Sequence, residues 1–317
     1  MGASTKSESS FLSITWLKLS LGPSVNIAIL GSGQIGTDLL IKLSKLVEFN
    51  VVLVAGRRAD SAGLKVATEM GIPTSTLGID GVLALTELDA VIDCTSAADH
   101  INHWNSLKDL SLHVLDMTPA KIGDVYIPNV LPIKDKGEQA YVNLNLVTCG
   151  GQSSSPIVSA LSKILAIKRV EIASNIASLS AGPATRANID EYIDTTEKVL
   201  AVVSGATQTK AILVLNPAVP PITMQTTIYI DFEPVKDFDA QVIIDEINTS
   251  IRGMQGYVPG VRLLMRPVIT SERITITLQV KGNGDYLPSY SGNLDIINAA
   301  AINALYDLYR RDAEVNV

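Results

Sequence analysis

The chain has 317 residues, of which 47% are hydrophobic and 18% are charged, so it is long enough for two domains with separate cores. Its net charge of −7 argues against a nucleic-acid partner, because phosphate binding needs clustered lysines and arginines. No apolar run reaches the roughly 20 residues of a membrane helix, so no membrane partner is expected. The cysteines, Cys94 and Cys149, allow at most one disulfide and no zinc-type cluster, which favours a cytoplasmic protein without a metal site.

Residues 1–24 differ from the rest of the chain in being rich in serine. The segment lacks the clean apolar core and small-residue cleavage site of a secretory signal. A myristoylation motif fails at Lys6, where serine or threonine is required. We therefore expect residues 1–24 to form an extension outside the folded domains.

The first folded element is expected at residues 25–30, a short apolar run typical of a buried parallel strand. It leads into Gly31-Ser32-Gly33-Gln34-Ile35-Gly36, and apolar residues then recur at helical spacing. In this motif the glycines permit the tight turn, the approach of a pyrophosphate and close packing of helix on strand. Strand, glycine motif and helix together predict a dinucleotide-binding site.

A second buried strand is expected at residues 51–55, and Arg57, Arg58 and Asp60 follow it. An NAD-selective site usually has an acidic residue here, to hold the ribose 2′-hydroxyl. Two arginines suit the 2′-phosphate of NADP better, whereas Asp60 suits the diol of NAD. The choice between NAD and NADP stays open.

Further strands are expected at residues 90–93 and 113–116, each followed by small or polar residues. In an open α/β sheet such segments face the ligand crevice. Cys94 directly extends a buried strand and lacks neighbouring glycines, so we interpret it as a packing residue. Residues 25–149 are thus predicted to form a Rossmann-type domain with a parallel sheet.

Cys149 is the candidate nucleophile. A strand is expected at residues 144–148 and a helix at 156–165, capped by Ser154 or Ser155, which puts the thiol close to a helix N-terminus. The helix dipole and free N–H groups there stabilise a thiolate and an oxyanion. No histidine follows Cys149 to serve as its base, since His100, His103 and His113 all precede it.

The second half reads as an α+β mixed-sheet domain for catalysis and dimerisation, over residues 150–292. A strand is expected near 170–176 and an amphipathic helix over 189–203, and residues 273–281 alternate as in an antiparallel strand with one wet face. A last helix, about 293–317, is expected to pack back on the first domain and complete it.

The motifs at residues 31–38, 95–97, 118–123 and 147–152 resemble those of acylating acetaldehyde dehydrogenases from aromatic and sterol ring degradation. The resemblance continues through Ser180-Ala181-Gly182-Pro183-Ala184-Thr185-Arg186-Ala187-Asn188-Ile189-Asp190, Leu215-Asn216-Pro217, Tyr257-Val258-Pro259-Gly260 and Tyr286-Leu287-Pro288-Ser289-Tyr290-Ser291-Gly292-Asn293-Leu294-Asp295. It covers the chain from about Val25 to the C-terminus. It implies oxidation of a short aldehyde such as acetaldehyde or propanal by NAD, with transfer of the acyl group from Cys149 to coenzyme A.

The resemblance also implies residue roles. Asn188, Ile189 and Leu213 would line the aldehyde pocket or its entrance. The residues implied to contact NAD are Ser32, Gly33, Gln34, Ile35, Ser180, Ala181, Gly182, Pro183, Ala184, Thr185, Arg186, Ala187, Asn188 and Asn293. The partners implied are a second copy of the chain and a 4-hydroxy-2-oxoacid aldolase, in a hetero-oligomer.

Two positions depart from the family pattern. Arg58 stands where an aspartate is usual, and Thr226 stands where the family has an aspartate that helps to activate the cysteine or coenzyme A. Either the helix dipole ionises Cys149, or another carboxylate such as Asp190 substitutes, or activity is reduced. The alternative functions are a non-catalytic dinucleotide sensor and an acyl-phosphate-type semialdehyde dehydrogenase.

Overall fold

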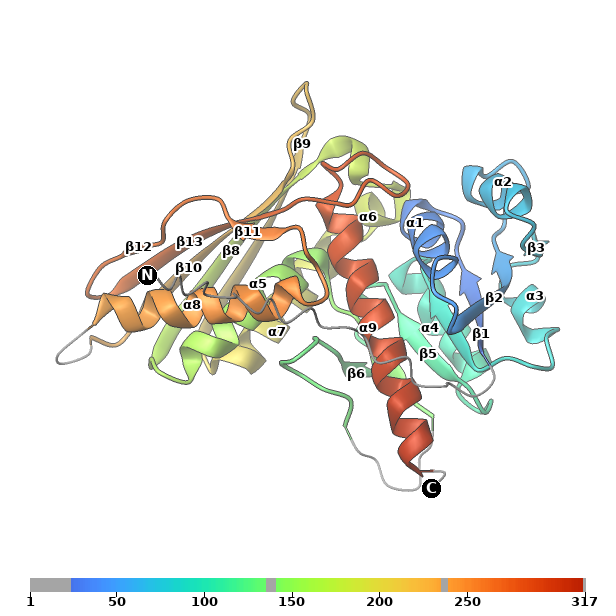
Figure 1. Cartoon of the computed structure of the whole chain (residues 1–317), viewed down its shortest axis with the longest axis horizontal. Helices are drawn as coiled ribbons and strands as arrows, with labels where there is room; N and C mark the ends of the chain where they lie inside the picture. The colour runs from blue at the N-terminus through green and yellow to red at the C-terminus, as the bar shows by residue number, and fades with distance from the viewer. Residues whose placement is uncertain (1–23, 135–140, 235–238, 316–317) are drawn as a thin grey trace, which may run out of the picture.

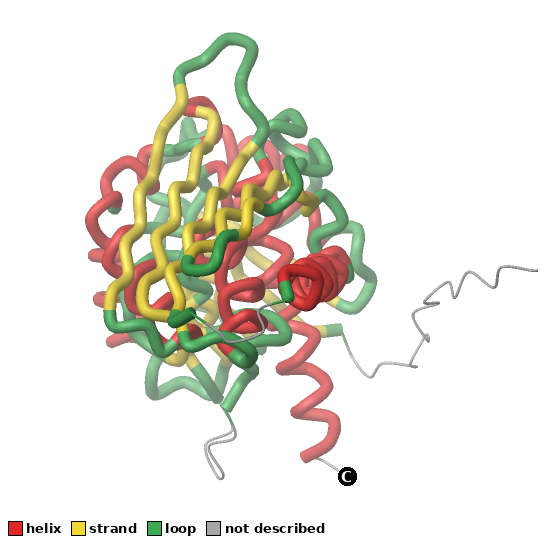
Figure 2. Tube along the Cα trace, turned by 90° about the vertical axis from the view of Figure 1, so that its left-hand side faces the viewer, coloured by secondary structure: helices red, strands yellow, loops and turns green. Residues whose placement is uncertain are grey.

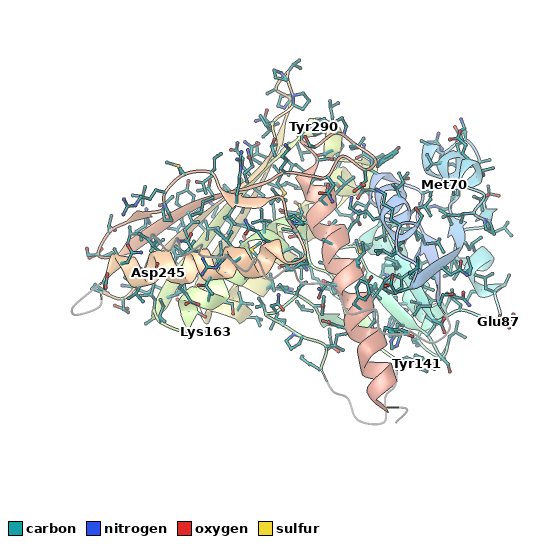
Figure 3. The ribbon with its side chains drawn as sticks, in the orientation of Figure 1. Met70, Glu87, Tyr141, Lys163, Asp245 and Tyr290 are labelled. Carbon is teal, nitrogen blue, oxygen red and sulfur yellow. The ribbon has the colours of Figure 1, made fainter. Side chains whose placement is uncertain are left out.

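The computed structural model describes residues 24–134, 141–234 and 239–315, and it contains two β-sheets (Figure 1). In Figure 3, Met70 and Glu87 mark the surface of the first domain, and Lys163 and Asp245 mark that of the second. The expected N-terminal extension lies outside the described residues, apart from Ser24. No helix in the described ranges combines the length and apolarity needed to cross a membrane.

The first sheet has seven strands, all paired in parallel, in the order β3-β2-β1-β4-β5-β7-β6. Strand order reverses on either side of β1, which creates the crevice where α/β sheets bind nucleotides. The predicted Rossmann-type parallel sheet is confirmed. Its strands are β1 (Val25–Leu30), β2 (Phe49–Ala55), β3 (Thr74–Ser75), β4 (Ala90–Asp93), β5 (His113–Asp116), β6 (Asp124–Val125) and β7 (Asn143–Asn145).

Helices pack on both faces of this sheet, as the connections between parallel strands require. Apolar residues of β1 alternate between two cores, with Ile27 and Ile29 in one and Ala28 and Leu30 in the other. The helices of this domain are α1 (Gln34–Leu43), α2 (Ala62–Glu69), α3 (Ile79–Leu83) and α4 (Ala97–Leu107).

The second sheet is mixed, in the order β11-β13-β10-β8-β9, with β12 paired to β13. On β13 the side chains of Ile274, Ile276, Leu278 and Val280 are fully buried, as the alternating sequence predicts. The strands are β8 (Ile167–Ala177), β9 (Gln208–Asn216), β10 (Met224–Phe232), β11 (Val261–Leu263), β12 (Val268–Ile269) and β13 (Arg273–Val280). They lie side by side at the near side of Figure 2, with helices behind them.

Helices α5 (Cys149–Ser162), α7 (Ile189–Ser204) and α8 (Ala240–Gln255) cover one face of the mixed sheet and share its core. A short 3₁₀ turn, η1 (Ser178–Ser180), and the short helix α6 (Pro183–Ala187) connect β8 to α7. The predicted mixed-sheet second domain is confirmed.

The C-terminal helix α9 (Gly292–Val315) runs between the two sheets and packs on α1 (Figure 1). Its Asn298 donates to Asp38 of α1 at 2.7 Å, and Asp295 forms an ion pair with Lys42 at 3.2 Å. Lys42 also contacts Asp285, just before α9, at 2.7 Å. This set of charges holds α9 against the first domain. The proposed boundaries 25–149 and 150–292 stay predictions.

The predicted helix start at Pro156 is wrong, because α5 already begins at Cys149. Gly150, Gly151 and the serines after them have poor helix propensity, but here they are all buried between the two sheets, and packing outweighs propensity. Pro156 lies inside the helix, and the preceding strand ends at Asn145 rather than at residue 148.

Candidate active site

A small cavity of about 80 Å³ lies between the two domains at the carboxyl ends of β4, β5 and β7. Cys149 is on its wall, together with residues from α6, α7 and α9. The lining residues are Ile35, Thr95, Met117, Thr118, Pro119, Val147, Thr148, Cys149, Ile176, Ala184, Thr185, Asn188, Tyr192, Asn293 and Ile297. The cavity thus joins the glycine-rich loop to the candidate nucleophile.

Cys149 is the first residue of α5, closer to the helix N-terminus than the sequence indicates. Thr148 caps the helix by accepting a hydrogen bond from the Gly151 N–H at 2.9 Å, which leaves the earlier N–H groups directed at the thiol. Burial raises the pKa of Cys149 to about 11, against hydrogen bonds from Tyr192 and from the N–H groups of Gly150 and Cys149, which lower it. The helix terminus alone therefore does not ionise the thiol at neutral pH.

Tyr192 is the one functional candidate here that the sequence did not single out. It was expected only as part of the buried face of the helix over 189–203. Its hydroxyl oxygen lies 3.9 Å from Cys149 Sγ, within reach of a hydrogen bond to sulfur. Helical periodicity marks Tyr192 as buried but cannot show which atom its hydroxyl meets.

Thr226, which stands where the family resemblance implies an aspartate, is fully buried on β10 and does not line the cavity. Its hydroxyl is within 2.9 Å of Ser153 Oγ and 3.3 Å of Ser174 Oγ. Asp190, the carboxylate suggested as a substitute, is exposed at the start of α7 and also lies outside the cavity lining. Neither residue supplies a base that touches Cys149.

The loop before Cys149 is held in an unusual backbone conformation. Val147 has φ 62°, in the left-handed region that β-branched residues avoid. Its N–H donates to Asn145 Oδ1 at 3.0 Å, and Asn145 Nδ2 donates to Asp116 Oδ2 at 2.9 Å and to Thr118 O at 3.0 Å. Asp116 in turn accepts from the Thr118 N–H at 2.7 Å.

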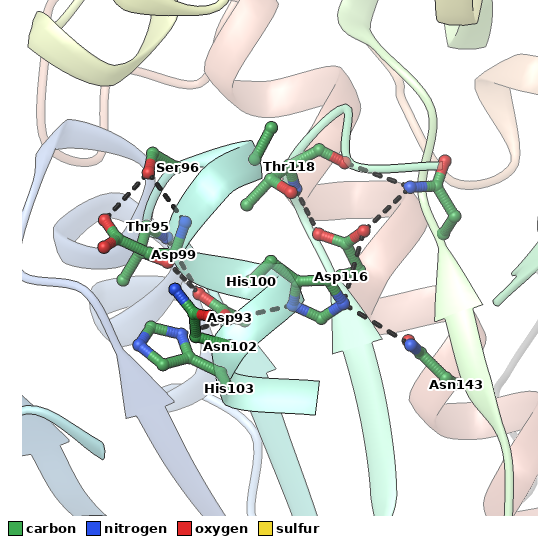
Figure 4. Close-up of polar contacts among 12 residues, drawn as sticks. Asp93, Thr95, Ser96, Asp99, His100, Asn102, His103, Asp116, Thr118 and Asn143 are labelled. Atoms are coloured by element: carbon green, nitrogen blue, oxygen red, sulfur yellow. Dashed lines mark hydrogen bonds and ion pairs between the residues drawn. The ribbon is translucent and has the colours of Figure 1, made fainter. Parts of the chain in front are cut away.

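Asp116 belongs to a buried polar network at the ends of β4 and β5 (Figure 4). His100 links the two strands, with Nδ1 2.9 Å from Asp93 Oδ2 and Nε2 3.5 Å from Asp116 Oδ2. His103 Nδ1 lies 2.7 Å from the same Asp93 oxygen. Neither histidine is among the described residues that line the cavity.

The two aspartates of the network have pKa values shifted in opposite directions. Burial alone would raise the pKa of Asp93, but hydrogen bonds from His100 and His103 outweigh it and lower the pKa to about 2. Burial raises the pKa of Asp116 to about 6, despite opposing contacts from His100, Thr118 and Asn145. Burial lowers the pKa of His100, but its hydrogen bond to Asp93 and the charge of Asp116 outweigh burial. The pKa of His100 is therefore raised above its ordinary value.

The glycine-rich loop has the geometry that the motif predicts. A side chain at Gly36 would come within 2.1 Å of Gly31 O, so this glycine permits the close packing of α1 on β1. At Gly33, the N-cap of α1, a Cβ would meet nothing within 4 Å, and no side chain caps the helix. The first-turn N–H groups of α1 are therefore open to an anion such as a pyrophosphate.

The loop from Ser178 to Asn188 lies against the glycine-rich loop. Gln34 Nε2 donates to Leu179 O at 3.1 Å, and Asn293 Nδ2 donates to Ser180 O at 3.1 Å. Arg186 Nε donates to Ala181 O at 3.0 Å. Asn188 Oδ1 accepts from the Ala97 N–H at 3.2 Å, which ties the loop to α4.

The structure gathers some of the implied site residues and separates others. Ile35, Ala184, Thr185, Asn188 and Asn293 meet Cys149 in the cavity. Ile189 begins α7 just outside it, and Leu213 lies on β9 against the core of the second domain. Ser32 contacts Ser61 in the first domain at 2.7 Å.

Arg57 and Arg58 are exposed at the end of β2, as a cofactor-selecting role requires. Arg57 pairs with Asp99 through two contacts of 3.2 Å, and Arg58 pairs with Asp60, with its Nη2 2.9 Å from Asp60 Oδ2. Asp60 thus contacts the arginine beside it. Cys94, the other thiol, is buried, and burial raises its pKa well above the ordinary value, as suits a packing residue.

Known proteins are similar to this chain in sequence. Residues 149–288 match the family model described as prokaryotic acetaldehyde dehydrogenase, dimerisation. An acetaldehyde dehydrogenase of Pectobacterium atrosepticum is 50% identical over 288 residues, which are 89% of this chain and 95% of the relative. Relatives of the same description from Spirochaeta aurantia and Geobacillus stearothermophilus are 46% and 45% identical, over 91% and 90% of this chain and 96% of each relative.

The chain belongs to the prokaryotic acetylating acetaldehyde dehydrogenase family. The resemblance inferred from the sequence motifs is confirmed. The protein is therefore an oxidoreductase of the acetaldehyde dehydrogenase type, and not the non-catalytic sensor or the acyl-phosphate-type enzyme considered as alternatives. The model that matches residues 149–288 assigns dimerisation to the mixed-sheet domain.

Proposed function

We propose that this enzyme oxidises short aliphatic aldehydes, such as acetaldehyde and propanal, and transfers the acyl group from Cys149 to coenzyme A. The observation that carries the proposal is the position of Cys149 as the first residue of α5, in a cavity that Ile35 of the glycine-rich loop also lines. This position puts a nucleophile next to the place where a dinucleotide-binding fold would hold the nicotinamide ring of its cofactor. The small, mostly apolar cavity favours a short aldehyde.

The residues on the cavity wall fit a bound NAD. Asn293 Oδ1 is buried there and has no hydrogen-bond partner among the described residues. The carboxamide of nicotinamide carries an N–H donor from which this oxygen could accept a hydrogen bond. The open N-terminus of α1 at Gly33 would hold the pyrophosphate.

Covalent catalysis at Cys149 divides the reaction into two transfers. The thiolate attacks the aldehyde carbon, a C–S bond forms, and the carbonyl electrons move to oxygen to give a thiohemiacetal. The Cys149 and Gly150 N–H groups are placed to stabilise that oxygen. NAD, when bound, accepts the hydride that leaves the carbon, and Cys149 is left as a thioester.

Coenzyme A completes the cycle as the acyl acceptor. Its thiol gives its proton to water, the resulting thiolate attacks the thioester carbon, the bond to Cys149 Sγ breaks, and the enzyme thiolate is regenerated. Cys149 lines the cavity, through which a second thiol would reach its sulfur. Since α5 begins at Cys149, the same N–H groups serve the second tetrahedral intermediate.

We propose NAD as the preferred cofactor, and NADP as the alternative that Arg57 and Arg58 keep open. Arg57 already pairs with Asp99, and Arg58 pairs with Asp60. These carboxylates weaken the attraction of the two arginines for a 2′-phosphate. We propose that NAD contacts the residues that the motifs imply, which are Ser32 to Ile35, Ser180 to Asn188, and Asn293. Ile189 and Leu213 are retained as residues of the aldehyde entrance.

We also propose an oligomeric state, a partner enzyme and a cellular location for this protein. Because the family model for dimerisation matches residues 149–288, we propose a homodimer through the mixed-sheet domain. The family resemblance supports a further partner, a 4-hydroxy-2-oxoacid aldolase that delivers the aldehyde, and a role in aromatic hydrocarbon catabolism in the cytoplasm. Neither nucleic acid nor membrane has a place in this proposal.

A steady-state assay tests the function. NADH formation is followed with acetaldehyde or propanal, with and without coenzyme A, for the wild type and Cys149→Ser. We expect sustained turnover only with coenzyme A and none in the variant, and NADP in place of NAD should give slower turnover. Sustained turnover without coenzyme A would contradict the acylating mechanism.

A further inference from the structure

Tyr192 is the only titratable side chain besides Cys149 among the described residues that line the cavity. A buried thiol with a raised pKa needs stabilisation of its thiolate before it can attack a carbonyl. Histidines and carboxylates, the usual sources, are missing from that lining. Within that lining, only uncharged groups are in a position to stabilise the Cys149 thiolate.

The Tyr192 hydroxyl is fixed in place against the sulfur. The side chain is 6% exposed, and the phenol oxygen lies 3.9 Å from Cys149 Sγ. A Cβ at Gly150 would come within 2.2 Å of that oxygen and 2.6 Å of Ser174 Oγ, so the glycine is what admits both hydroxyls beside the helix N-terminus. Contacts with the side chains of Ser174 and Thr148 act to lower the pKa of the phenol, against the effect of burial.

A backbone carbonyl fixes the direction of the hydroxyl protons in the group formed by Ser153, Thr226 and Ser174. Ser153 donates to Gly150 O at 3.0 Å, so the 2.9 Å contact between Ser153 and Thr226 uses the Thr226 proton. Thr226 then has no proton left for Ser174. The Ser174 proton is thus free to point either to Thr226 Oγ1, at 3.3 Å, or to the phenol oxygen of Tyr192.

We propose that the Tyr192 hydroxyl donates a hydrogen bond to the Cys149 thiolate and so acts as a catalytic residue that stabilises the nucleophile. The proposal rests on the proposed function only in taking Cys149 as that nucleophile. When the thiol loses its proton to water in the crevice, the Tyr192 O–H turns to Sγ and Ser174 donates to the phenol oxygen. Tyr192 keeps its own proton throughout.

The electrostatics of Tyr192 agree with a donor and not a base. Burial raises the pKa of Tyr192 well above its ordinary value, and the neighbouring Cys149 raises it further. The phenol is therefore protonated wherever the enzyme is folded and active. The hydrogen bond from Tyr192 lowers the pKa of Cys149, although burial keeps that pKa above its ordinary value.

Alkylation of Cys149 by iodoacetamide tests the proposal without aldehyde, NAD or coenzyme A. Its rate is measured against pH for the wild type, Tyr192→Phe and Tyr257→Phe, and alkylation of Cys149→Ser is subtracted to remove any contribution from Cys94. Tyr257→Phe is the matched control, because its buried hydroxyl has no hydrogen-bond partner among the described residues. Circular dichroism and the melting temperature check the fold of each variant.

We expect the midpoint of alkylation in Tyr192→Phe to rise by about one pH unit, which is about a tenfold lower rate at a fixed pH below the midpoint. Tyr257→Phe should match the wild type, and Ser174→Ala should show a smaller rise in the same direction. An unchanged midpoint in Tyr192→Phe, or an equal rise in Tyr257→Phe, would overturn the proposal. Absence of turnover in the wild type would instead refute the proposed function.

Discussion

Asn145 accepts a hydrogen bond from the backbone N–H of Val147 at 3.0 Å, and this contact holds Val147 in the left-handed region at φ 62°. The strained residue stands two positions before Cys149, at the point where the chain leaves β7 and enters α5. Asn145 is itself fixed by Asp116 and by Thr118 O. The buried polar network of the first domain thus sets the direction in which α5 presents its first residue.

Replacing Asn145 by alanine should therefore reduce both stability and activity. The change leaves the buried Val147 N–H without an acceptor and removes a donor from Asp116, which should cost about 2–4 kcal/mol of unfolding free energy. Urea unfolding measures this loss, and kcat should fall because Cys149 shifts. Asn50→Ala is the control, since it removes an exposed bond to Asn26 and should stay within about 0.5 kcal/mol. Equal losses in the two variants would refute the positioning role.

Gly150→Ala should damage the site directly. The added methyl group would lie 2.2 Å from the Tyr192 oxygen and 2.6 Å from Ser174 Oγ, so the Tyr192 hydroxyl would have to move from its position beside Cys149 Sγ. We expect kcat/KM to fall on the order of a hundredfold. Gly253→Ala in α8 is the matched control, because its methyl group meets nothing within 4 Å and should be neutral or stabilising by up to about 1 kcal/mol. Full activity in Gly150→Ala would contradict the tight contact.

The sequence predicts the first domain well because each of its signals is local. β1, β4 and β5 have the predicted bounds, since short apolar runs ending in glycine or polar residues suit only buried parallel strands. The start of α5 fails for the opposite reason. Its first two turns read as a loop and are helical because Thr148 caps them and both domains bury them.

The surroundings of Cys149 could not be predicted in the same way. Tyr192, Ser174 and Thr226 are far apart in the chain, and they meet only through the packing of α7 on α5 and the register that pairs Thr226 with Ser174. The sequence predicts Cys149 as the nucleophile, and the family resemblance implies an aspartate where Thr226 stands. The sequence cannot identify the hydroxyl that lies beside the sulfur.

Gly33→Ala tests the cofactor site separately from the fold. Gly33 has φ −81° and open space around it, so alanine fits the free protein without strain. A bound pyrophosphate needs that space, and we expect the dissociation constant for NAD to rise at least about tenfold, with an unchanged melting temperature. Isothermal titration calorimetry measures the affinity. Equal NAD affinity in variant and wild type would place the cofactor elsewhere.

Asp93 should contribute stability that depends on pH. Its pKa falls from 3.8 to about 2 on folding, so this contribution is present above about pH 4 and is lost as the pH falls towards 2. The shift corresponds to about 2 kcal/mol. In urea unfolding, Asp93→Asn should be less stable than the wild type at pH 5, and the difference from the wild type should shrink as the pH falls from about 4 towards 2. A difference that does not change with pH would show that Asp93 is not held ionised by His100 and His103.

The most direct test of the account is whether Cys149 carries the acyl group. The enzyme is incubated with acetaldehyde and NAD but without coenzyme A, quenched in acid, and digested for mass spectrometry. We predict one acetyl group on the peptide that contains Cys149, formed together with one equivalent of NADH and removed when coenzyme A is added before the quench. An unmodified Cys149 peptide after a full equivalent of NADH has formed would contradict the account.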